Sequence, residues 1–250
     1  MATTVTYKGQ TLATVDNQTK TLQTAGTWCE DDFTLTDVTQ GGGITAEDVL
    51  RDLEPSGSVE ITLDPAMSLR TVGFNGKPIE TLIVNGLISV SGSNGPFKYM
   101  TSLRKCVLPD LANTYQGEHF AGSFLADGTG ICILQGFSGG QYNIFGTNNY
   151  VGLIDFGANC TRIMSLYRSL SLNKIILRNS NAVVTLNNTS ELNNTPFASG
   201  GAGGTLYVPS ALISSYQSAT NWSTILGYST NSIQAIEGSA YEDTDWWVNY

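Results

Sequence analysis

The feature that most constrains the fold is a recurring pattern of apolar residues between Ile79 and Val208. The pattern reads apolar-x-x-apolar-x-apolar, and its last two apolar positions are filled in all of the segments that fit it. The six segments are Ile79-x-x-Leu82-x-Val84, Leu103-x-x-Cys106-x-Leu108, Thr129-x-x-Cys132-x-Leu134, Val151-x-x-Ile154-x-Phe156, Leu172-x-x-Ile175-x-Leu177 and Gly203-x-x-Leu206-x-Val208. Apolar residues at every second position are typical of a strand, so we predict one strand in each segment.

The spacing of these segments favours a solenoid. Successive middle positions lie 24, 26, 22, 21 and 31 residues apart, mostly within the period of about 20 to 29 residues of leucine-rich repeats. An ordinary β-sandwich is the alternative, but its strands recur at about half of this spacing. Asn159 falls where a leucine-rich repeat places its Asn or Cys, and we expect its side chain to satisfy backbone groups at the turn after the strand.

The chain before the repeats divides into two parts. Short alternating runs such as Val5-Thr-Tyr7 predict a small β module over residues 1–40. Three consecutive glycines from Gly41 then predict a hinge, and a capping pattern at Thr45 predicts a short helix that ends near Leu53. We assign this hinge and helix to residues 41–58 and the solenoid to residues 59–208.

The chain after the repeats predicts a cap and a tail. Pro209 suits the start of a helix, and Leu212 and Tyr216 are spaced for one apolar face, so residues 209–240 are expected to shield the last repeat. Residues 241–250 mix carboxylates with Trp246, Trp247 and Tyr250. These three aromatic residues are candidate subunit contacts, because Trp side chains are enriched at interface hot spots. The alternative is that the tail folds back onto its own repeats.

Composition disfavours two classes of partner. Only 13% of the 250 residues are charged, the formal net charge is -9 and the pI is about 4.4. Binding to a phosphate backbone needs clustered Lys and Arg, so we expect no nucleic acid partner. The same charge repels anionic membrane surfaces, and no apolar run approaches the roughly 18 residues of a membrane-spanning helix. The first residues lack the pattern of a secretory signal, so we expect the chain to fold in the cytoplasm.

Residues suited to catalysis or metal binding are sparse. The four cysteines, Cys29, Cys106, Cys132 and Cys160, show no CxxC pairing, so we expect buried reduced thiols instead of a zinc site or a disulfide framework. The single histidine, His119, leaves little room for a nucleophilic triad and is expected to be a solvated loop residue.

Acidic residues are also too few for a dense catalytic cleft. Within or beside the repeat strands they are limited to Glu80 and Asp155. A glycosidase needs a pair of carboxyl groups on either side of the bond that it cleaves. We therefore predict that the protein is not an enzyme and that it needs no cofactor or metal, and a polysaccharide depolymerase is the enzymatic alternative.

Two segments resemble known proteins. The runs from Leu172 to Asn179 and from Leu206 to Leu212, followed by Tyr216 and Ala219-Thr-Asn-Trp222-Ser, resemble the closing portion of BspA-like leucine-rich repeat proteins. Many of these proteins are encoded by phages and prophages of gut Firmicutes. Residues 4–38, with Tyr7-Lys-Gly9 and Asp31-Asp-Phe-Thr-Leu35, resemble a short module of phage tail and baseplate proteins.

The resemblance implies a virion structural role or cell-surface adhesion, without catalysis. The chain shows neither a signal peptide nor a C-terminal anchor, which favours the particle over a bacterial surface adhesin. We expect a mainly β protein of a tail, baseplate or head fibre, assembled in the host cytoplasm as a homo-oligomer. Its N-terminal β module would dock onto other phage structural proteins, and its leucine-rich-repeat-like solenoid with a short C-terminal capping helix would bind a host-surface glycan or protein. The alternative is a passive decoration or spacer protein of the virion.

Overall fold

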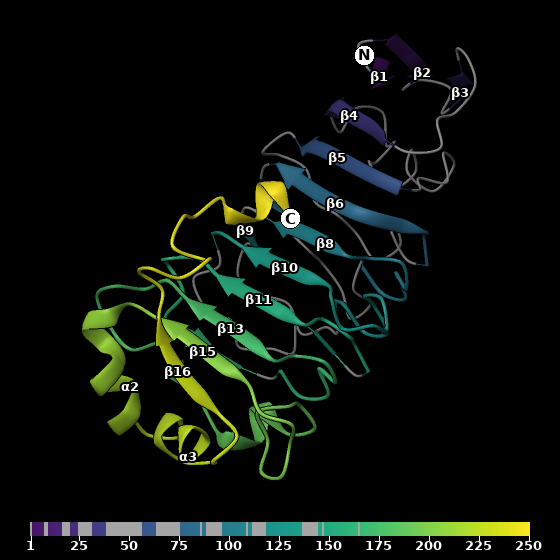
Figure 1. Cartoon of the computed structure of the whole chain (residues 1–250). Coiled ribbons are helices and arrows are strands. Elements are labelled where there is room, and N and C mark those ends of the chain that lie inside the picture. The colour runs from purple at the N-terminus through teal and green to yellow at the C-terminus, as the bar shows by residue number, and fades with distance from the viewer. Residues whose placement is uncertain are drawn as a thin grey trace.

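A computed structural model shows a mainly β protein with one long twisted sheet and few helices (Figure 1). The structure describes residues 2–7, 10–16, 21–24, 32–38, 57–63, 76–85, 87–88, 97–108, 110–111, 119–136, 145–146, 148–164 and 166–250. Up to residue 63 it describes the backbone of the strands alone. The predicted helix that ends near Leu53 and the glycine hinge lie outside these residues.

The long sheet contains twelve strands, and nine of them are parallel neighbours in chain order. These nine are β4 (Asp32–Val38), β5 (Gly57–Leu63), β6 (Ile79–Asn85), β8 (Lys105–Leu108), β10 (Ile131–Leu134), β11 (Leu153–Phe156), β13 (Lys174–Leu177), β15 (Thr205–Val208) and β16 (Ser232–Ala235). The other three, β1 (Ala2–Tyr7), β2 (Gln10–Asp16) and β3 (Thr21–Thr24), pair antiparallel at one end. This parallel order differs from the antiparallel sheets of a β-sandwich.

Two further pairs of short parallel strands lie in the connections between the long strands. They are β7 (Leu87–Ile88) with β9 (Asp110–Leu111), and β12 (Arg162–Ile163) with β14 (Thr185–Leu186). Each pair joins the connections that follow two neighbouring strands of the sheet, β6 and β8 in the first pair and β11 and β13 in the second. The connections are therefore stacked in the same order as the strands.

The strand register confirms the alignment that the apolar pattern predicts. All six segments form strands, and their middle residues pair directly with one another in a single row across the sheet. The row consists of Leu82, Cys106, Cys132, Ile154, Ile175 and Leu206, all of which are fully buried. The next apolar pattern position forms a second row, which contains Leu108, Leu134, Phe156 and Leu177. The periodicity thus marks the face of the sheet that points to the main core.

Phenylalanine side chains from the connections pack opposite these rows. Phe97 stacks on Phe120, and Phe120 stacks on Phe145, with ring centroids 4.9 and 5.4 Å apart. Phe97, Phe145 and Phe197 each lie nine residues before the middle strand residue of their repeat. A second periodic signal in the sequence therefore marks the opposite wall of the core, and the strand pattern alone did not use it.

A helical segment follows β15, where the sequence predicts a C-terminal cap. It contains a 3-10 turn, η2 (Ser210–Leu212), and two short helices, α2 (Ile213–Ser218) and α3 (Trp222–Leu226). Tyr216 Oη accepts a hydrogen bond from the backbone N–H of Val184, and Trp222 Nε1 donates one to the carbonyl oxygen of Val184. Both aromatic side chains are buried and close the end of the main core. Two more 3-10 turns are η1 (Thr189–Leu192) and η3 (Trp246–Asn249).

Two expectations about this region are corrected. The cap does not end the sheet, because residues 232–235 form β16, which pairs with β15 in parallel register. Asn159 is exposed and does not stabilise the turn after its strand. The buried side chain of Asn179 has that role in the neighbouring repeat, where it donates to the carbonyl oxygen of Cys160 and accepts from two backbone N–H groups.

Candidate functional site

The chain after β16 crosses back over the outer face of the sheet, which is the face opposite the main core (Figure 1). The outer face is apolar, with Val107, Ile131, Ile133, Leu153 and Ile176 all buried. Tyr241, Trp246 and Trp247 pack against these residues from above. We call residues 237–250 the C-terminal strap. Where the strap covers the outer face, strands such as β10 and β13 carry apolar residues on both faces, as in other covered parallel sheets.

A buried ion pair interrupts this apolar face. Asp155 lies on β11 in the row that also contains Ile133 and Ile176, and it faces Arg178, which follows β13. Arg178 donates from Nε and Nη2 to both carboxylate oxygens of Asp155 at 2.8 to 3.0 Å. The side chain of Asp155 is only 3% exposed and that of Arg178 only 10%. A buried carboxylate needs such pairing, because desolvation of an isolated charge costs several kcal/mol.

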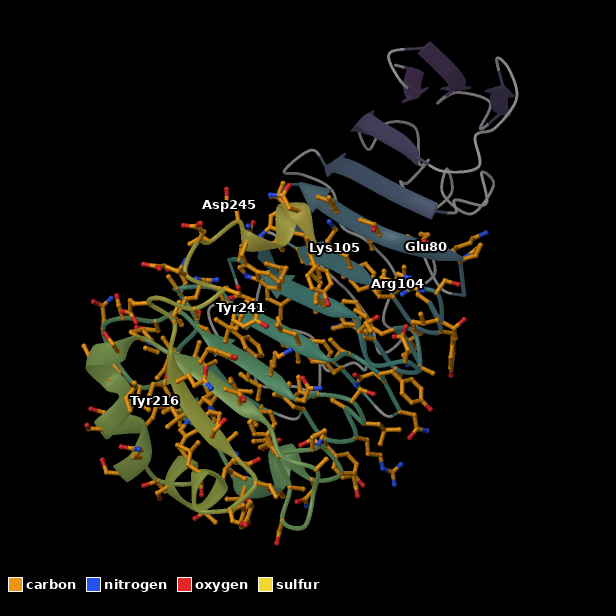
Figure 2. The ribbon with its side chains drawn as sticks, viewed as in Figure 1. Glu80, Arg104, Lys105, Tyr216, Tyr241 and Asp245 are labelled. Carbon is orange, nitrogen blue, oxygen red and sulfur yellow. The ribbon has the colours of Figure 1, made fainter. Side chains whose placement is uncertain are left out.

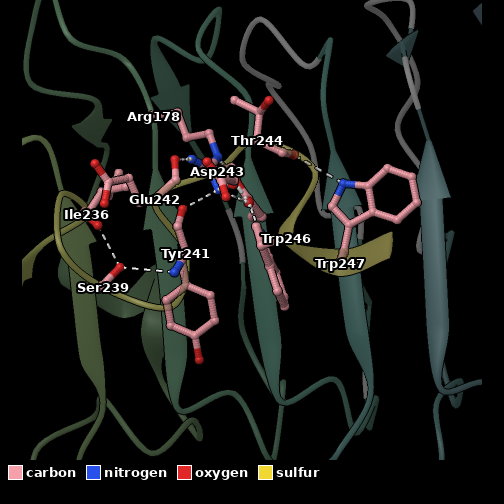
Figure 3. Close-up of polar contacts among 10 residues, drawn as sticks. Arg178, Ile236, Ser239, Tyr241, Glu242, Asp243, Thr244, Trp246 and Trp247 are labelled. Atoms are coloured by element: carbon pink, nitrogen blue, oxygen red, sulfur yellow. Dashed lines mark hydrogen bonds and ion pairs between the residues drawn. The ribbon is translucent and has the colours of Figure 1, made fainter. Parts of the chain in front are cut away.

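The same two side chains hold the strap. Arg178 donates to three consecutive strap carbonyl oxygens, those of Tyr241 at 2.8 Å, Glu242 at 3.4 Å and Asp243 at 3.1 Å (Figure 3). Trp246 Nε1 donates to Asp155 Oδ2 at 2.8 Å. Each member of the ion pair therefore makes one set of bonds to its partner and another to the strap.

A second attachment lies near the chain end, above β8 and β10. Lys105 Nζ donates to the backbone oxygens of Trp247 and Tyr250, both at 3.3 Å, and Tyr250 Oη donates to the carbonyl oxygen of Thr129 at 3.0 Å. Lys105 lies beside the final turn of the strap in Figure 2. Tyr241 and Trp246 meet edge to face, with ring centroids 4.9 Å apart.

A cleft of about 410 Å³ opens between the strap and the carboxyl ends of the sheet strands. Ile133, Asp155 and Arg178 line it from the sheet, Glu237 and Glu242 from the strap. Its other lining residues are Gln135, Gly157, Ala158, Ser180, Pro209, Ile236 and Thr244. Several of these residues are exposed, so solvent reaches the cleft. Its volume lies within the range of about 300 to 1,000 Å³ that is typical of small-molecule sites.

Local contacts shift the pKa values of the charged groups around the strap. Burial raises the pKa of Asp155, and the Arg178 guanidinium and the Trp246 indole oppose that rise. Backbone N–H groups, including that of Ser210, lower the pKa of the exposed Glu237. Burial lowers the pKa of Lys105. The cleft therefore places the carboxyl groups of Glu237 and Glu242 next to the paired side chains of Asp155 and Arg178.

The structure places the three candidate subunit contacts against the chain's own sheet. Trp246 and Trp247 are partly buried on the outer face, whereas Tyr250 is 59% exposed. The alternative that the tail folds back is thus what the single chain shows, and a contact between subunits stays a prediction. Sequence reasoning missed Arg178, although its distance of 23 residues from Asp155 is about one repeat.

The remaining candidate residues lie in the core. Cys106, Cys132 and Cys160 are free and buried, as the sequence predicts, and Cys29 lies outside the described residues. Burial raises the pKa of Cys160 to about 12, which makes its thiol unreactive. The expectation of a solvated His119 is wrong, because this residue is buried, with 5% of its surface exposed. Within the part of the chain that the structure describes, no group of three or more His, Cys, Asp or Glu residues could hold a metal ion.

Comparisons with protein-family models, with curated protein sequences and with solved structures find no match to this chain. Among the described residues no helix has both the length and the apolar character needed to cross a membrane.

Proposed function

We propose that this chain is a structural protein of a bacteriophage particle, in which a leucine-rich-repeat-like solenoid is displayed for binding to the host surface. The observation that carries the proposal is the order of the sheet, in which each repeat contributes one parallel strand beside the strand of the preceding repeat. Stacking of this kind favours a solenoid, whose repeats contact only their neighbours and form an extended binding surface. The resemblance to BspA-like repeats and to phage tail modules supports a place in the particle.

The cleft at Asp155 and Arg178 is the binding site that we propose within this solenoid. Over β8, β10, β11 and β13 the outer face is covered by the strap, whereas the cleft is accessible and combines polar with apolar walls. Ligand sites commonly have this combination of an apolar wall and a few convergent polar groups. The N-terminal module, residues 1–40, would then dock onto other particle proteins, and the copies would form a symmetric oligomer.

A binding experiment on intact cells tests this proposal. The purified full chain, labelled with a fluorophore, is incubated with cells of the bacterium that carries the encoding genome, and with the same cells after their surface polysaccharide is stripped. We expect saturable binding that stripping reduces if the receptor is a glycan and leaves unchanged if it is a protein. Absence of binding to both kinds of cell would contradict the proposed role in attachment.

A passive spacer of the virion is the second candidate, and the covered outer face favours it. A density map of the intact particle separates the two. Host binding predicts that residues 1–40 are clamped into the particle while the cleft faces solvent. A spacer predicts that both ends of the chain and the cleft are buried between subunits.

Glycan cleavage has less support from the geometry. The cleft does gather three carboxyl groups, those of Asp155, Glu237 and Glu242, which is more than the sequence suggested. However, both oxygens of Asp155 accept hydrogen bonds from Arg178, so this group is not available as an acid or a nucleophile. Incubation of the chain with purified host polysaccharide should release no reducing ends, and their release would support a depolymerase.

A further inference from the structure

The cleft beneath the strap carries an inference about the chemistry of the ligand. It lies where β10, β11, β13, β15 and β16 end, so the chain leaves the sheet there at five adjacent positions. The residues that follow parallel strands lie together at the carboxyl ends of the strands, where open parallel sheets commonly bind ligands. The strap forms the opposite wall. It is held in place by Arg178, so the shape of the cleft is defined before a ligand enters.

The charge of the cleft excludes one class of ligand. The only lining cation, Arg178, is neutralised by Asp155 and donates its remaining hydrogen bonds to strap carbonyl oxygens. Glu237 and Glu242 leave a net negative charge at the entrance, where both residues are exposed. Groups such as uronate, phosphate or sulfate are repelled by this field, whereas hydroxyl and ammonium groups can donate hydrogen bonds to the carboxylates.

The apolar part of the lining adds a second requirement. Ile133 and Ile236 are buried side chains that face the cleft, and Pro209 lies beside them. A ligand that fits therefore has an apolar face for these residues and hydrogen-bond donors at its rim. A pyranose ring has both, because its C–H groups form an apolar face and its hydroxyl groups lie around the edge.

We propose that this cleft binds one non-anionic sugar residue, a neutral hexose or a hexosamine, with Glu237 and Glu242 as acceptors for its hydroxyl or ammonium groups. This inference rests on the proposed function, because it names the ligand class of the host-binding site. The carboxylates already accept hydrogen bonds from backbone N–H groups, Glu237 from Ser210 at 2.9 Å and Glu242 from Gly238 at 3.0 Å. Both acceptors are thereby oriented in advance, which reduces the entropy lost on binding.

Titration of the full chain with three monosaccharides tests the inference. Galactose, glucosamine and glucuronate are added in turn while saturation-transfer NMR detects bound sugar. We expect signals for galactose and glucosamine and none for glucuronate. The double substitution Glu237→Gln and Glu242→Gln removes both charges while amide oxygens remain, so it should weaken glucosamine binding by about tenfold and reduce the discrimination against glucuronate. Equal binding of all three sugars by the unmodified chain would overturn the inference.

A blocking variant shows whether the sugar occupies this cleft. Ala158 is exposed and lines the cleft, so Ala158→Trp fills it without disturbing the core. Ala202 is also exposed but lies before β15, at the amino ends of the strands, so Ala202→Trp is the matched control. We expect Ala158→Trp to abolish the sugar signals and Ala202→Trp to leave them unchanged. Persistence of the signals in Ala158→Trp would contradict binding in this cleft.

The same two variants separate this inference from the proposed function. If Ala158→Trp still binds host cells as well as the unmodified chain, attachment uses another surface, so the cleft is not the host-binding site while the proposed role in attachment stands. If the unmodified chain binds sugar in the cleft but binds no host cells, the inference stands and the proposed role in attachment fails.

Discussion

The two faces of the sheet are both buried, but they are buried by different means. The inner face packs against apolar side chains of the connections, such as Phe97, Phe145 and Tyr216. The outer face packs against a strap that lies 63 to 145 residues further along the chain, and hydrogen bonds from Arg178 and Lys105 fix it there. Inner-face burial is therefore inseparable from formation of the repeats. Outer-face burial depends on a few polar attachments.

A matched pair of substitutions should give the largest effect and sharpen this comparison. Ile154 lies on the inner face and Ile133 on the outer face, and their exposed fractions are 0% and 1%. We expect Ile154→Ala to lower the free energy of unfolding by about 4 kcal/mol and Ile133→Ala by about 2 kcal/mol, because the strap can move to fill part of the space. Urea denaturation measures both. Equal losses would mean that the outer face is packed as rigidly as the inner one.

Removal of the central attachment comes next. Arg178→Met leaves Asp155 buried without its charged partner and frees three strap carbonyl oxygens. Breaking one side of a buried ion pair costs about 3 kcal/mol, and we expect a loss of that size in urea denaturation. The double substitution Asp155→Leu with Arg178→Met is the control. It should cost less than Arg178→Met alone, because no unpaired charge stays buried, and a larger cost would argue against this account.

The pH dependence of the same variant follows from the pKa of Asp155. Burial raises this pKa, and Arg178 opposes the rise, so Arg178→Met should raise it further. A raised pKa means that the folded chain holds a proton at a pH where the unfolded chain has lost it. The variant therefore regains stability as pH falls from 7 toward about 4, the ordinary value for Asp, by about 2 kcal/mol. The free energy of unfolding of both proteins is measured across this range. The difference between Arg178→Met and the unmodified chain should shrink as pH falls, and a constant difference would contradict the proposed role of the Asp155 pKa.

The inner face could be predicted from the sequence because its signal is local and periodic. The apolar pattern found the strands, and the register confirms that its middle positions form one row. The two strands that flank the six segments, β5 and β16, were missed for different reasons. Ile233 lies 27 residues after Leu206 but was assigned to the cap, and Val59 lies 23 residues before Leu82 but follows the residues assigned to a hinge. Both spacings fall within the range of the predicted repeats, so only the assignment of neighbouring residues to a cap and to a hinge hid these two strands.

The cleft and the strap could not be predicted in the same way. Their residues come from separate repeats and from the chain end, so no single window of sequence contains them. One partial signal was present, because β10 and β13 are apolar on both faces, which indicates that something covers the outer face. The aromatic residues of the tail were identified as contact residues, but the pattern did not say what they contact. Asp155 within an apolar strand was the remaining clue to a buried partner.

A smaller effect is expected from the indole of the strap. Trp246→Phe keeps an aromatic ring beside Tyr241 but removes the hydrogen bond to Asp155. A hydrogen bond to a charged group contributes about 1.5 kcal/mol or slightly more, so urea denaturation should show a loss of that size. Trp247→Phe is the matched control, since the Trp247 indole donates to the carbonyl oxygen of Thr244 within the strap and not to the sheet. Trp247→Phe should lower the free energy of unfolding by less than Trp246→Phe does. Equal losses would mean that the hydrogen bond to Asp155 does not stabilise the packing of the strap on the sheet.

The smallest effect is expected at the attachment above β8. Lys105 donates to two backbone oxygens at 3.3 Å, both near the chain end, and it is only partly buried. Lys105→Met keeps the apolar stem and removes the donor, and such long hydrogen bonds contribute about 1 kcal/mol or less. Hydrogen exchange is the sensitive measurement, because local opening of residues 247–250 should increase while exchange in the strands stays unchanged. If exchange increases across the whole strap, the two attachments act as one cooperative unit and the outer face is released in a single step.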